Sequence, residues 1–401
     1  MAPPRILVMI LAGGAGGRLE LLTDDRAKPA VPYAGNYRLI DFPLSNCRHA
    51  GLSDVWIVEQ FHPVSLSDHL SNGRPWDLDR STGGLLVLHP SLGHEGEGWH
   101  KGTADALFRY RRLIRDFDAA AVIVVSADAV YKLDYSEVVA EHLRTGAGVT
   151  MVTTEVQPED ASRYGVVQVD DSGRITDYAY KPESPKGNLV ANEVFVFDPE
   201  RMLTVLEELA PDADPEEGLA DLGTALLPHL VQDGVARQFA FDGYWRDVGT
   251  VQSYWSSHME LLADQPPIEL DAGDWPILTS GGRRGPAAVS EGAEVSRSLL
   301  SSGSSVAGSV QRSVLAGGVV VEAGAVVVDS VVLQDAVIRA GARVTRAVVD
   351  AHSVVGADAQ VGESGDGEIT LIGRAATVPD GAAVPAGGRF PQPEDEDGDG
   401  S

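Results

Sequence analysis

The chain has 401 residues, which is more than one small domain usually holds. Its 31 Lys and Arg against 59 Asp and Glu give a net charge of −28, which disfavours binding to nucleic acid or to an anionic membrane surface. The single cysteine, Cys47, excludes an intrachain disulfide and a cysteine-rich metal site. The apolar run 6–12 is far shorter than the ~20 residues that a membrane helix needs, so we expect a cytoplasmic protein.

Residues 1–262 alternate short, β-branched apolar runs with helical stretches. The predicted strands are 6–11, 55–58, 121–125 and 149–154, and the predicted helices are 104–115, 136–144, 203–209 and 251–262. Strands that alternate with helices predict an α/β fold with a mostly parallel, Rossmann-like sheet covered on both faces. Three further runs lie closer together and predict a β-rich insertion: 166–169, 175–180 and 194–197.

Residues 287–388 follow a different period. Apolar residues recur at every sixth position: Val314, Val320, Val326, Val332, Ile338 and Val344. After a one-residue slip the spacing resumes at Val349, Val355 and Val361. A period of six fits neither a helix nor an alternating strand, and it predicts a parallel β-helix of hexapeptide coils, each with an inward aliphatic residue. A valine-rich β-sandwich is the alternative.

The composition changes twice more along the chain. Proline and glycine in residues 263–286 predict a linker between a first domain, 1–262, and a β-helix domain, 287–388. Residues 389–401 carry a run of carboxylates and predict an acidic, disordered tail.

A glycine-rich loop directly follows the first predicted strand. Its glycines are Gly13, Gly14, Gly16 and Gly17. Without a Cβ, they let backbone N–H groups approach phosphate oxygens, and Arg18 adds a cationic fork. The residue order fits neither a dinucleotide-binding fingerprint nor a Walker loop. With Arg26 and Lys28 close behind, the loop predicts a triphosphate site, and a plain turn is the alternative.

From this loop onward the sequence resembles the sugar-1-phosphate nucleotidyltransferases, and among them it is most similar to the glucose-1-phosphate adenylyltransferases. The resemblance starts with Leu11-Ala12-Gly13-Gly14, Arg18-Leu19 and Arg26-Ala27-Lys28-Pro29-Ala30-Val31. Further matching segments are 37–47, 102–106, 127–135, 164–166, 181–182, 244–250 and 275–277. They stand in the family's order and cover nearly the whole chain. The resemblance also implies that the C-terminal β-helix is left-handed.

The resemblance implies a reaction in which the oxygen of a sugar 1-phosphate attacks the α-phosphorus of ATP and pyrophosphate leaves. Arg18, Lys28 and Asp128 are the implied catalytic residues, and Asp128 and Asp247 would hold Mg²⁺. The implied nucleotide-binding residues are Leu11, Ala12, Gly13, Gly14, Gly16, Gly17, Arg18, Gly102, Thr103 and Asp105. The implied sugar-phosphate-binding residues are Gly165, Tyr180, Lys181, Asn192 and Glu193.

The sequence departs from the family pattern where substrates are chosen. Ser91 and Leu92 stand where family members carry glutamines that help to read adenine, which puts the base preference in doubt. Tyr180 replaces a glutamate that contacts glucose, and Glu193 replaces a glycine. We hypothesise that Glu193 takes over sugar contact and favours an amino sugar such as glucosamine 1-phosphate; a solvent-facing Glu193 is the alternative.

Asp25 stands where many activated family members carry a lysine that binds an anionic effector, so we expect weak activation or none by sugar bisphosphates. Three other readings stay open. The chain could use another base or sugar, or act as a catalytically weak regulatory subunit. An acyltransferase is a third reading, because hexapeptide coils also host such enzymes, but His352 is the single histidine in residues 287–388. The resemblance further implies a homotetramer, with no nucleic-acid or membrane partner.

Overall fold

The computed structural model describes residues 4–14, 16–90, 100–213 and 218–392. The chain divides into two compact units. The first consists of Met1–Gly14 and Phe42–Trp245, and the second of Ala15–Asp41 and Arg246–Ser401. Residues 15–41 therefore pack with the C-terminal part of the chain, although the sequence placed them in the first domain. The proposed tail from 393 onward lies outside the described residues.

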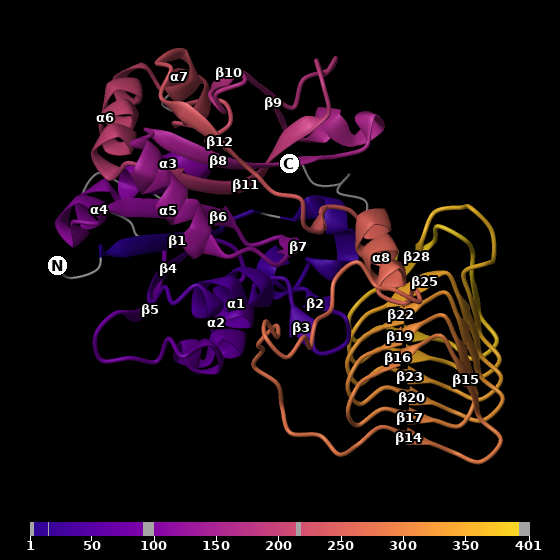
Figure 1. Ribbon diagram of the computed structural model, residues 1–401. Helices are drawn as coiled ribbons and strands as arrows, with labels where there is room; N and C mark the ends of the chain where they lie inside the picture. The colour runs from indigo at the N-terminus through magenta and orange to yellow at the C-terminus, as the bar shows by residue number, and fades with distance from the viewer. Residues whose placement is uncertain (1–3, 15, 91–99, 214–217, 393–401) are drawn as a thin grey trace, which may run out of the picture. The chain divides into compact units, whose positions relative to one another are not determined.

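The first unit is built on one nine-stranded mixed sheet (Figure 1). Its parallel half has the order β6-β1-β4-β5, formed by β1 (Ile6–Ala12), β4 (Asp54–Glu59), β5 (Gly84–Leu88) and β6 (Ala121–Ser126). Because β1 lies between its two parallel neighbours, the chain leaves it at a topological switch point, where α/β sheets bind ligands. The glycine-rich loop begins at this point.

The other half of the sheet is largely antiparallel and contains the predicted β-rich insertion. Its strands are β8 (Val149–Glu155), β9 (Gly165–Val169), β10 (Ile175–Tyr180), β11 (Leu189–Phe197) and β12 (Ala236–Ala240). Strand β11 runs antiparallel to β6, β8 and β9, whereas β12 runs parallel to β8. The sheet is thus parallel at the nucleotide-loop end and antiparallel where the sugar-phosphate residues were expected.

Of the helices described in this unit, those at Thr103–Arg109, Arg111–Phe117, Pro199–Leu209 and Leu226–Gln232 bury one apolar core together with the sheet. The helices described in this unit are α1 (Asp41–His49), α2 (Pro63–Leu70), α3 (Thr103–Arg109), α4 (Arg111–Phe117), α5 (Tyr135–Thr145), α6 (Pro199–Leu209) and α7 (Leu226–Gln232). The 3₁₀ turns are η3 (Ser71–Trp76), η4 (Pro158–Arg163) and η5 (Ala210–Asp212), and β7 (Ala129–Tyr131) and β13 (Trp245–Asp247) are short strands outside the main sheet. The expected helix 104–115 is two helices, because the chain leaves helical geometry at Tyr110.

In the second unit, residues 15–41 form short elements around helix α8 (Val251–Glu260). These elements are η1 (Gly17–Leu22), η2 (Lys28–Ala30), β2 (Pro32–Tyr33) and β3 (Tyr37–Arg38). The Tyr254 hydroxyl donates to the Pro32 carbonyl at 2.6 Å, and the Ala34 N–H donates to Nε2 of His258 at 3.0 Å. On the other side of α8, Nε1 of Trp255 donates to the Asp329 carbonyl at 2.7 Å. The helix therefore ties the N-terminal segment to the β-helix.

The rest of the second unit is a left-handed β-helix of three six-stranded parallel sheets (Figure 1). One sheet is β14 (Ala288–Val289), β17 (Ser305–Val306), β20 (Val320–Val321), β23 (Val337–Ile338), β26 (Val354–Val355) and β29 (Thr377–Val378). The second is β15 (Glu294–Ser296), β18 (Ser309–Gln311), β21 (Val326–Val328), β24 (Arg343–Thr345), β27 (Gln360–Val361) and β30 (Ala383–Val384). The third is β16 (Leu299–Leu300), β19 (Val314–Leu315), β22 (Val331–Val332), β25 (Ala347–Val349), β28 (Thr370–Ile372) and β31 (Arg389–Phe390).

The repeat of this β-helix corrects part of the predicted register. Val314 pairs with Val331 and Val326 with Arg343, so these middle coils take 17 residues, or two six-residue sides and one five-residue side. An earlier coil takes 15 residues, from Leu299 to Val314, and a later one takes 23, from Ala347 to Thr370. The shorter side shifts the inward position, and Leu315, Val321 and Val327 belong to the apolar core of the β-helix in place of the expected Val314, Val320 and Val326. Strand β31 also extends the β-helix to Phe390, two residues beyond the predicted end.

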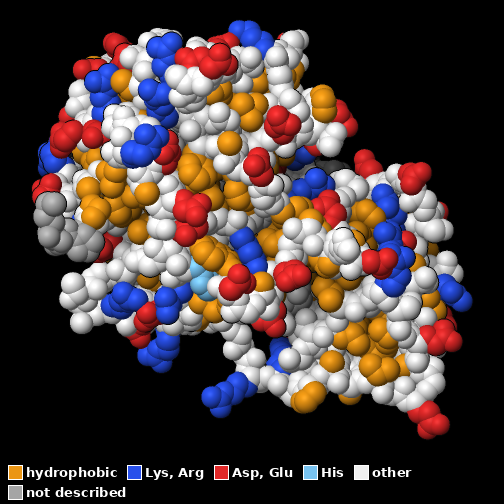
Figure 2. All heavy atoms as spheres, viewed as in Figure 1, with side chains coloured by type: hydrophobic (Ala, Val, Ile, Leu, Met, Phe, Trp, Pro, Cys, Tyr) orange, Lys and Arg blue, Asp and Glu red, His pale blue; other side chains and the backbone are white. Residues whose placement is uncertain are grey.

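Charge is distributed over the surface. On the face shown in Figure 2, basic and acidic side chains are interspersed, so the acidic excess is not gathered into one patch on that face. Among the described residues, no helix is long and apolar enough to cross a membrane.

Candidate active site

In the first unit, the glycine-rich loop opens onto a cavity of about 120 Å³. Its lining residues are Leu11, Gly13, Gly14, Val58, Gln60, His100, Gly102, Thr103, Ala106 and Asp221. Five of these were predicted nucleotide-binding residues: Leu11, Gly13, Gly14, Gly102 and Thr103. They come from the carboxyl end of β1, the loop that follows it and the start of α3. This arrangement suits a planar, mostly uncharged ligand group.

Gly102 is required by the close approach of two backbones. A Cβ at this position would lie 2.0 Å from the Ala220 carbonyl oxygen. The same carbonyl accepts the Ala104 N–H at 3.0 Å, which fixes the start of α3. No side chain can enter this space without moving the backbone.

Thr103 and Asp221 connect the cavity to its surroundings. The Thr103 hydroxyl and N–H both donate to Oδ1 of Asp221 at 3.3 Å, and the Leu222 N–H donates to the Thr103 hydroxyl at 2.8 Å. Oδ2 of Asp221 accepts the Tyr180 hydroxyl at 3.3 Å, so Asp221 bridges the cavity and a predicted sugar-phosphate residue. Asp105 does not line the described cavity, since its carboxylate accepts from the Lys101 N–H at 2.9 Å and from Arg109 at 2.7 Å.

Five lining residues were missed from the sequence, and three of them are polar: Gln60, His100 and Asp221. Gln60 follows the carboxyl end of β4, so its strand-end position could have revealed it. Its amide nitrogen donates to the His100 carbonyl at 2.9 Å. Burial lowers the pKa of His100, which keeps its imidazole neutral at pH 7. Asp221 is 118 residues from Thr103, and no sequence pattern marks it.

The predicted sugar-phosphate residues gather on β9, β10 and β11. Gly165 pairs with Tyr180 on one side and with Ala191 on the other. Gly165 is needed here, because a Cβ would lie 2.5 Å from the Tyr178 hydroxyl. Nζ of Lys181 lies 4.5 Å from the centre of the Tyr180 ring. Burial lowers the pKa of Lys181, but Tyr180, Glu193 and Asp221 outweigh it and the net effect raises this pKa. Lys181 is therefore a permanent cation.

Asn192 and Glu193 lie at an irregularity in β11, where the register with β8 shifts between Ala191 and Phe195. Glu193 has a φ of +62°, in the left-handed region that favours glycine. This is the position where the family pattern has glycine, and the chain keeps that backbone conformation with a carboxylate residue. Asn192 is 1% exposed, and neither polar atom of its side chain has a hydrogen-bond partner.

In the second unit, Gly16 starts the turn that carries Arg18. Gly16 has a φ of +73°, and a Cβ there would lie 2.9 Å from Cγ2 of Thr23 and 3.3 Å from Cβ of Lys28. The Thr23 hydroxyl lies 3.0 Å from the carbonyls of both Gly16 and Glu20, to which it can donate. The turn is thereby closed on itself, with Arg18 exposed and the following Leu19 buried.

Three predicted residues meet around Gly249 in this unit. Nζ of Lys28 lies 3.9 Å from Oδ1 of Asp247, and both side chains are largely buried. A Cβ on Gly249 would lie 2.9 Å from the Asp247 carboxylate and 3.3 Å from Nη2 of Arg18. Glycine thus allows two cations and a carboxylate to cluster. Arg26, from the same segment, forms a buried ion pair of 2.8 Å with Asp350 of the β-helix.

Asp128 directly follows the carboxyl end of β6 in the first unit, where the Ser126 hydroxyl donates to its Oδ1 at 2.5 Å. Asp128 and Asp247 offer carboxylate oxygens, the donors that Mg²⁺ prefers, so their chemistry fits the implied metal. Within the described ranges, no group of three or more His, Cys, Asp or Glu side chains forms a complete metal site.

Comparison with known proteins decides the family. Residues 7–264 match the nucleotidyl transferase family, and residues 286–373 match the GlmU-like C-terminal hexapeptide family. The glucose-1-phosphate adenylyltransferase of Thermomicrobium roseum is 44% identical over 299 residues, which are 74% of this chain and 69% of that protein. This chain belongs to the glucose-1-phosphate adenylyltransferase family. The Thermotoga neapolitana relative is 42% identical over 80% of this chain and 76% of its own, and the Bacillus cereus relative is 38% identical over 82% and 87%.

Membership of the glucose-1-phosphate adenylyltransferase family confirms the enzyme class and the substrate classes, a nucleoside triphosphate and a sugar 1-phosphate. Nucleotidyltransferases of this kind generally use a divalent metal ion. The individual site residues stay predictions. Ser91 and Leu92, which bear on the base preference, lie outside the described residues.

Proposed function

We propose that this protein transfers the adenylyl group of ATP to glucose 1-phosphate, releasing ADP-glucose and pyrophosphate, and that the product supplies the synthesis of glycogen or a similar α-glucan. The observation that supports this most strongly is identity of 38–44% to named glucose-1-phosphate adenylyltransferases over most of the chain. The cavity at the end of β1 suits the base, and the cations around Gly249 suit the phosphates.

In the proposed reaction, a phosphate oxygen of glucose 1-phosphate attacks the α-phosphorus of ATP. The bond from the α-phosphorus to the bridging oxygen breaks, and pyrophosphate leaves with the negative charge. Arg18 and Lys28 neutralise that charge, and Lys181 holds the acceptor phosphate. Asp128 and Asp247 would hold Mg²⁺, which supplies charge neutralisation when bound. The protein contributes positioning and electrostatics, with no covalent enzyme intermediate.

Pyrophosphate release by the purified protein tests this proposal. Four nucleoside triphosphates are crossed with glucose 1-phosphate, glucosamine 1-phosphate and mannose 1-phosphate, with Mg²⁺ present. We expect the highest kcat/KM for ATP with glucose 1-phosphate. Asp128→Asn should abolish turnover, whereas Asp177→Asn, which changes an exposed carboxylate paired with Lys186, should not. Normal turnover by Asp128→Asn would refute the role of Asp128, and no release with any pair would favour a regulatory subunit.

Glucosamine 1-phosphate is a second candidate acceptor, and the backbone of Glu193 favours it. A left-handed conformation costs a residue other than glycine about 1 kcal/mol. Glu193 has this conformation, so we infer that its carboxylate has a function that offsets the cost. A carboxylate pairs well with the ammonium group of an amino sugar. Glu193→Gln should lower the preference for glucosamine 1-phosphate over glucose 1-phosphate by about tenfold. An unchanged ratio of the two kcat/KM values would end this hypothesis.

The remaining expectations are also proposals. We infer that residues 1–262 form the catalytic domain in the functional sense, although 15–41 and 246–262 pack with the second unit. The family resemblance implies a homotetramer, which light scattering of the purified chain tests. The proposed cytoplasmic location rests on the shortness of the apolar run 6–12. Asp25 is expected to weaken activation by sugar bisphosphates, which an effector titration tests.

A further inference from the structure

An ion pair in the second unit links the turn that carries Arg18 to the last coil of the β-helix. Nε and Nη2 of Arg389 donate to the two carboxylate oxygens of Glu20, and the Nη2–Oε1 distance is 2.9 Å. The two residues are 369 positions apart in the chain. A two-point contact between guanidinium and carboxylate fixes orientation as well as distance. Neither residue belongs to a motif that the proposed function uses.

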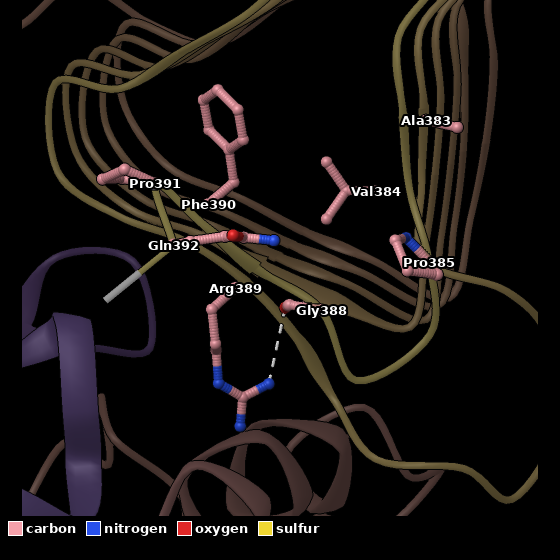
Figure 3. A pocket seen from close by; sticks show the side chains of 8 residues that line it. All are labelled: Ala383, Val384, Pro385, Gly388, Arg389, Phe390, Pro391 and Gln392. Atoms are coloured by element: carbon pink, nitrogen blue, oxygen red, sulfur yellow. Dashed lines mark hydrogen bonds between the residues drawn. The ribbon is translucent and has the colours of Figure 1, made fainter. Parts of the chain in front are cut away.

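Arg389 is itself held in place. Its third nitrogen, Nη1, donates to the carbonyls of Ile369 at 2.8 Å and Gly387 at 2.7 Å. Figure 3 shows the Arg389 side chain pointing away from Phe390 and Val384, which line the open end of the β-helix. The Arg389 side chain is 17% exposed. Its guanidinium is therefore a fixed anchor rather than a mobile surface group.

Glu20 has a backbone conformation that needs support. Its φ of 51° and ψ of −134° interrupt the turn Gly17–Leu22 with a geometry that L-residues rarely adopt. Such a conformation persists where surrounding contacts hold it. The Glu20 carbonyl accepts the Thr23 N–H at 2.8 Å, and Arg389 holds its carboxylate. The residue is thus fixed at both its backbone and its side chain.

Arg18 precedes Glu20 by two residues and shares a cavity with it. This cavity of about 420 Å³ is lined by Gly17, Arg18, Glu20, Thr250, Val251, Gln252, Glu368, Ile369 and Arg389. Arg18 is exposed, so the direction of its side chain depends on the backbone of residues 17–20. If Arg389 were absent, the Glu20 carboxylate would lie unpaired beside Arg18 and would compete with a phosphate for it.

We infer that Glu20 and Arg389 are positioning residues, which hold the turn so that Arg18 is available to the triphosphate. The last coil of the β-helix thereby takes part in nucleotide binding without touching the nucleotide. This inference rests on the proposed function for its kinetic consequence but not for the geometry of the turn.

Steady-state kinetics test the consequence. Arg389→Gln and Glu20→Gln should each raise the KM for ATP by about tenfold while kcat changes by less than about threefold. The double variant should show about the same increase, because both changes break the same pair. Arg389→Lys keeps the charge and should restore part of the affinity. Arg284→Gln is the matched control, since it breaks a bidentate pair with Asp335 on the same β-helix and should leave the KM unchanged.

Limited proteolysis tests the geometry independently of turnover. Trypsin cleaves after Arg18 only when the turn opens, so Arg389→Gln and Glu20→Gln should accelerate this cut at least several-fold, and Arg284→Gln should not. Mass spectrometry identifies the fragments. Unchanged cleavage at Arg18, or an unchanged KM beside a lower melting temperature, would overturn the inference. A wild-type protein that releases no pyrophosphate would refute the proposed function alone, because the proteolysis would still decide whether the pair holds the turn.

Discussion

The cavity of the first unit and the cavity beside Arg18 in the second are built from different groups. The first is lined by glycines, aliphatic residues and neutral polar side chains, with Asp221 as its one charged lining residue within the described chain. The second has four charged lining residues: Arg18, Glu20, Glu368 and Arg389. The interactions that hold the lining residues in place differ as well. Backbone packing and hydrogen bonds fix the first, whereas ion pairs fix the second.

We propose that this difference reflects the two halves of a nucleoside triphosphate. A base is planar and neutral and needs shape and a few polar contacts, whereas phosphates need fixed positive charge. If this assignment holds, changes in the first region should alter the choice of base, and changes in the second should weaken every triphosphate alike. The four predictions below test it, from the largest expected effect to the smallest.

Replacing Arg18 should give the largest effect. Arg18→Gln removes the charge that we propose for the phosphates, so kcat/KM should fall by about 100- to 1000-fold for ATP and for any other triphosphate used. The ratio between triphosphates should stay constant. Pyrophosphate release measures both. A loss of kcat/KM with only one of the triphosphates would contradict this assignment, because Arg18 would then contact the base.

Acid should lower the stability of the second unit, because His258 is buried there in its neutral form. Complete burial lowers the pKa of His258 from 6.5 to about 4, so the folded state keeps this imidazole neutral. The unfolded state binds the proton first as the pH falls. As the pH falls from 6.5 to 4, the free energy of unfolding should therefore decrease by about 3 kcal/mol because of His258.

Chemical denaturation at several pH values, with wild type and His258→Gln, measures this share. The variant should lose less stability on acidification than the wild type. His229→Gln, at a partly exposed histidine of α7, is the control and should follow the wild-type profile. Parallel profiles for wild type and His258→Gln would contradict the prediction.

A methyl group at Gly102 should destabilise the first unit next to its cavity. Gly102→Ala places a Cβ against the Ala220 carbonyl, which should cost about 1–3 kcal/mol of stability. Gly14→Ala is the matched control, because a Cβ there meets nothing within 4 Å. Its free energy of unfolding should change by less than about 0.5 kcal/mol. Equal destabilisation of the two variants would contradict the close approach.

Gln60 should give the smallest and most selective effect. Gln60→Leu removes a polar contact from the cavity of the first unit, so kcat/KM for ATP should fall by about tenfold. The fall should be smaller for at least one other triphosphate, since a base contact is specific. Gln238→Leu, on β12, is a control of the same chemistry and should leave the ratios unchanged. An equal loss for all triphosphates would assign Gln60 to the phosphates.

Much of the fold could be predicted because it depends on spacing along the chain. The strands β1, β4, β6 and β8 lie within one or two residues of their predicted ranges, since buried strands leave continuous apolar runs. The six-residue period predicted the β-helix, which the structure confirms. The inward positions Val314, Val320 and Val326 were wrong by one residue, because the slip between Val344 and Val349 was recognised in the sequence but the equivalent slip between Val327 and Val332 was not.

The site residues also divide into those that the sequence predicted and those that it missed. The glycine loop after a strand is a local signal, and it pointed to Gly13 and Gly14, whereas Thr103 came from the family resemblance; all three line the cavity of the first unit. It also predicted Lys28 and Asp247, which the second unit brings to 3.9 Å. It missed Asp221, which no motif marks.

By itself, the sequence determined the strand and helix pattern, the coil repeat, the glycine loop and the family. Only the tertiary structure decided that residues 15–41 pack with the β-helix, that Gly102 must be glycine because of Ala220, and that Arg389 holds Glu20. The physical reason is the range of the interactions. Backbone conformation and hydrophobic periodicity are set by neighbours in sequence, whereas an ion pair across 369 residues exists only once both partners have been placed by the folded core.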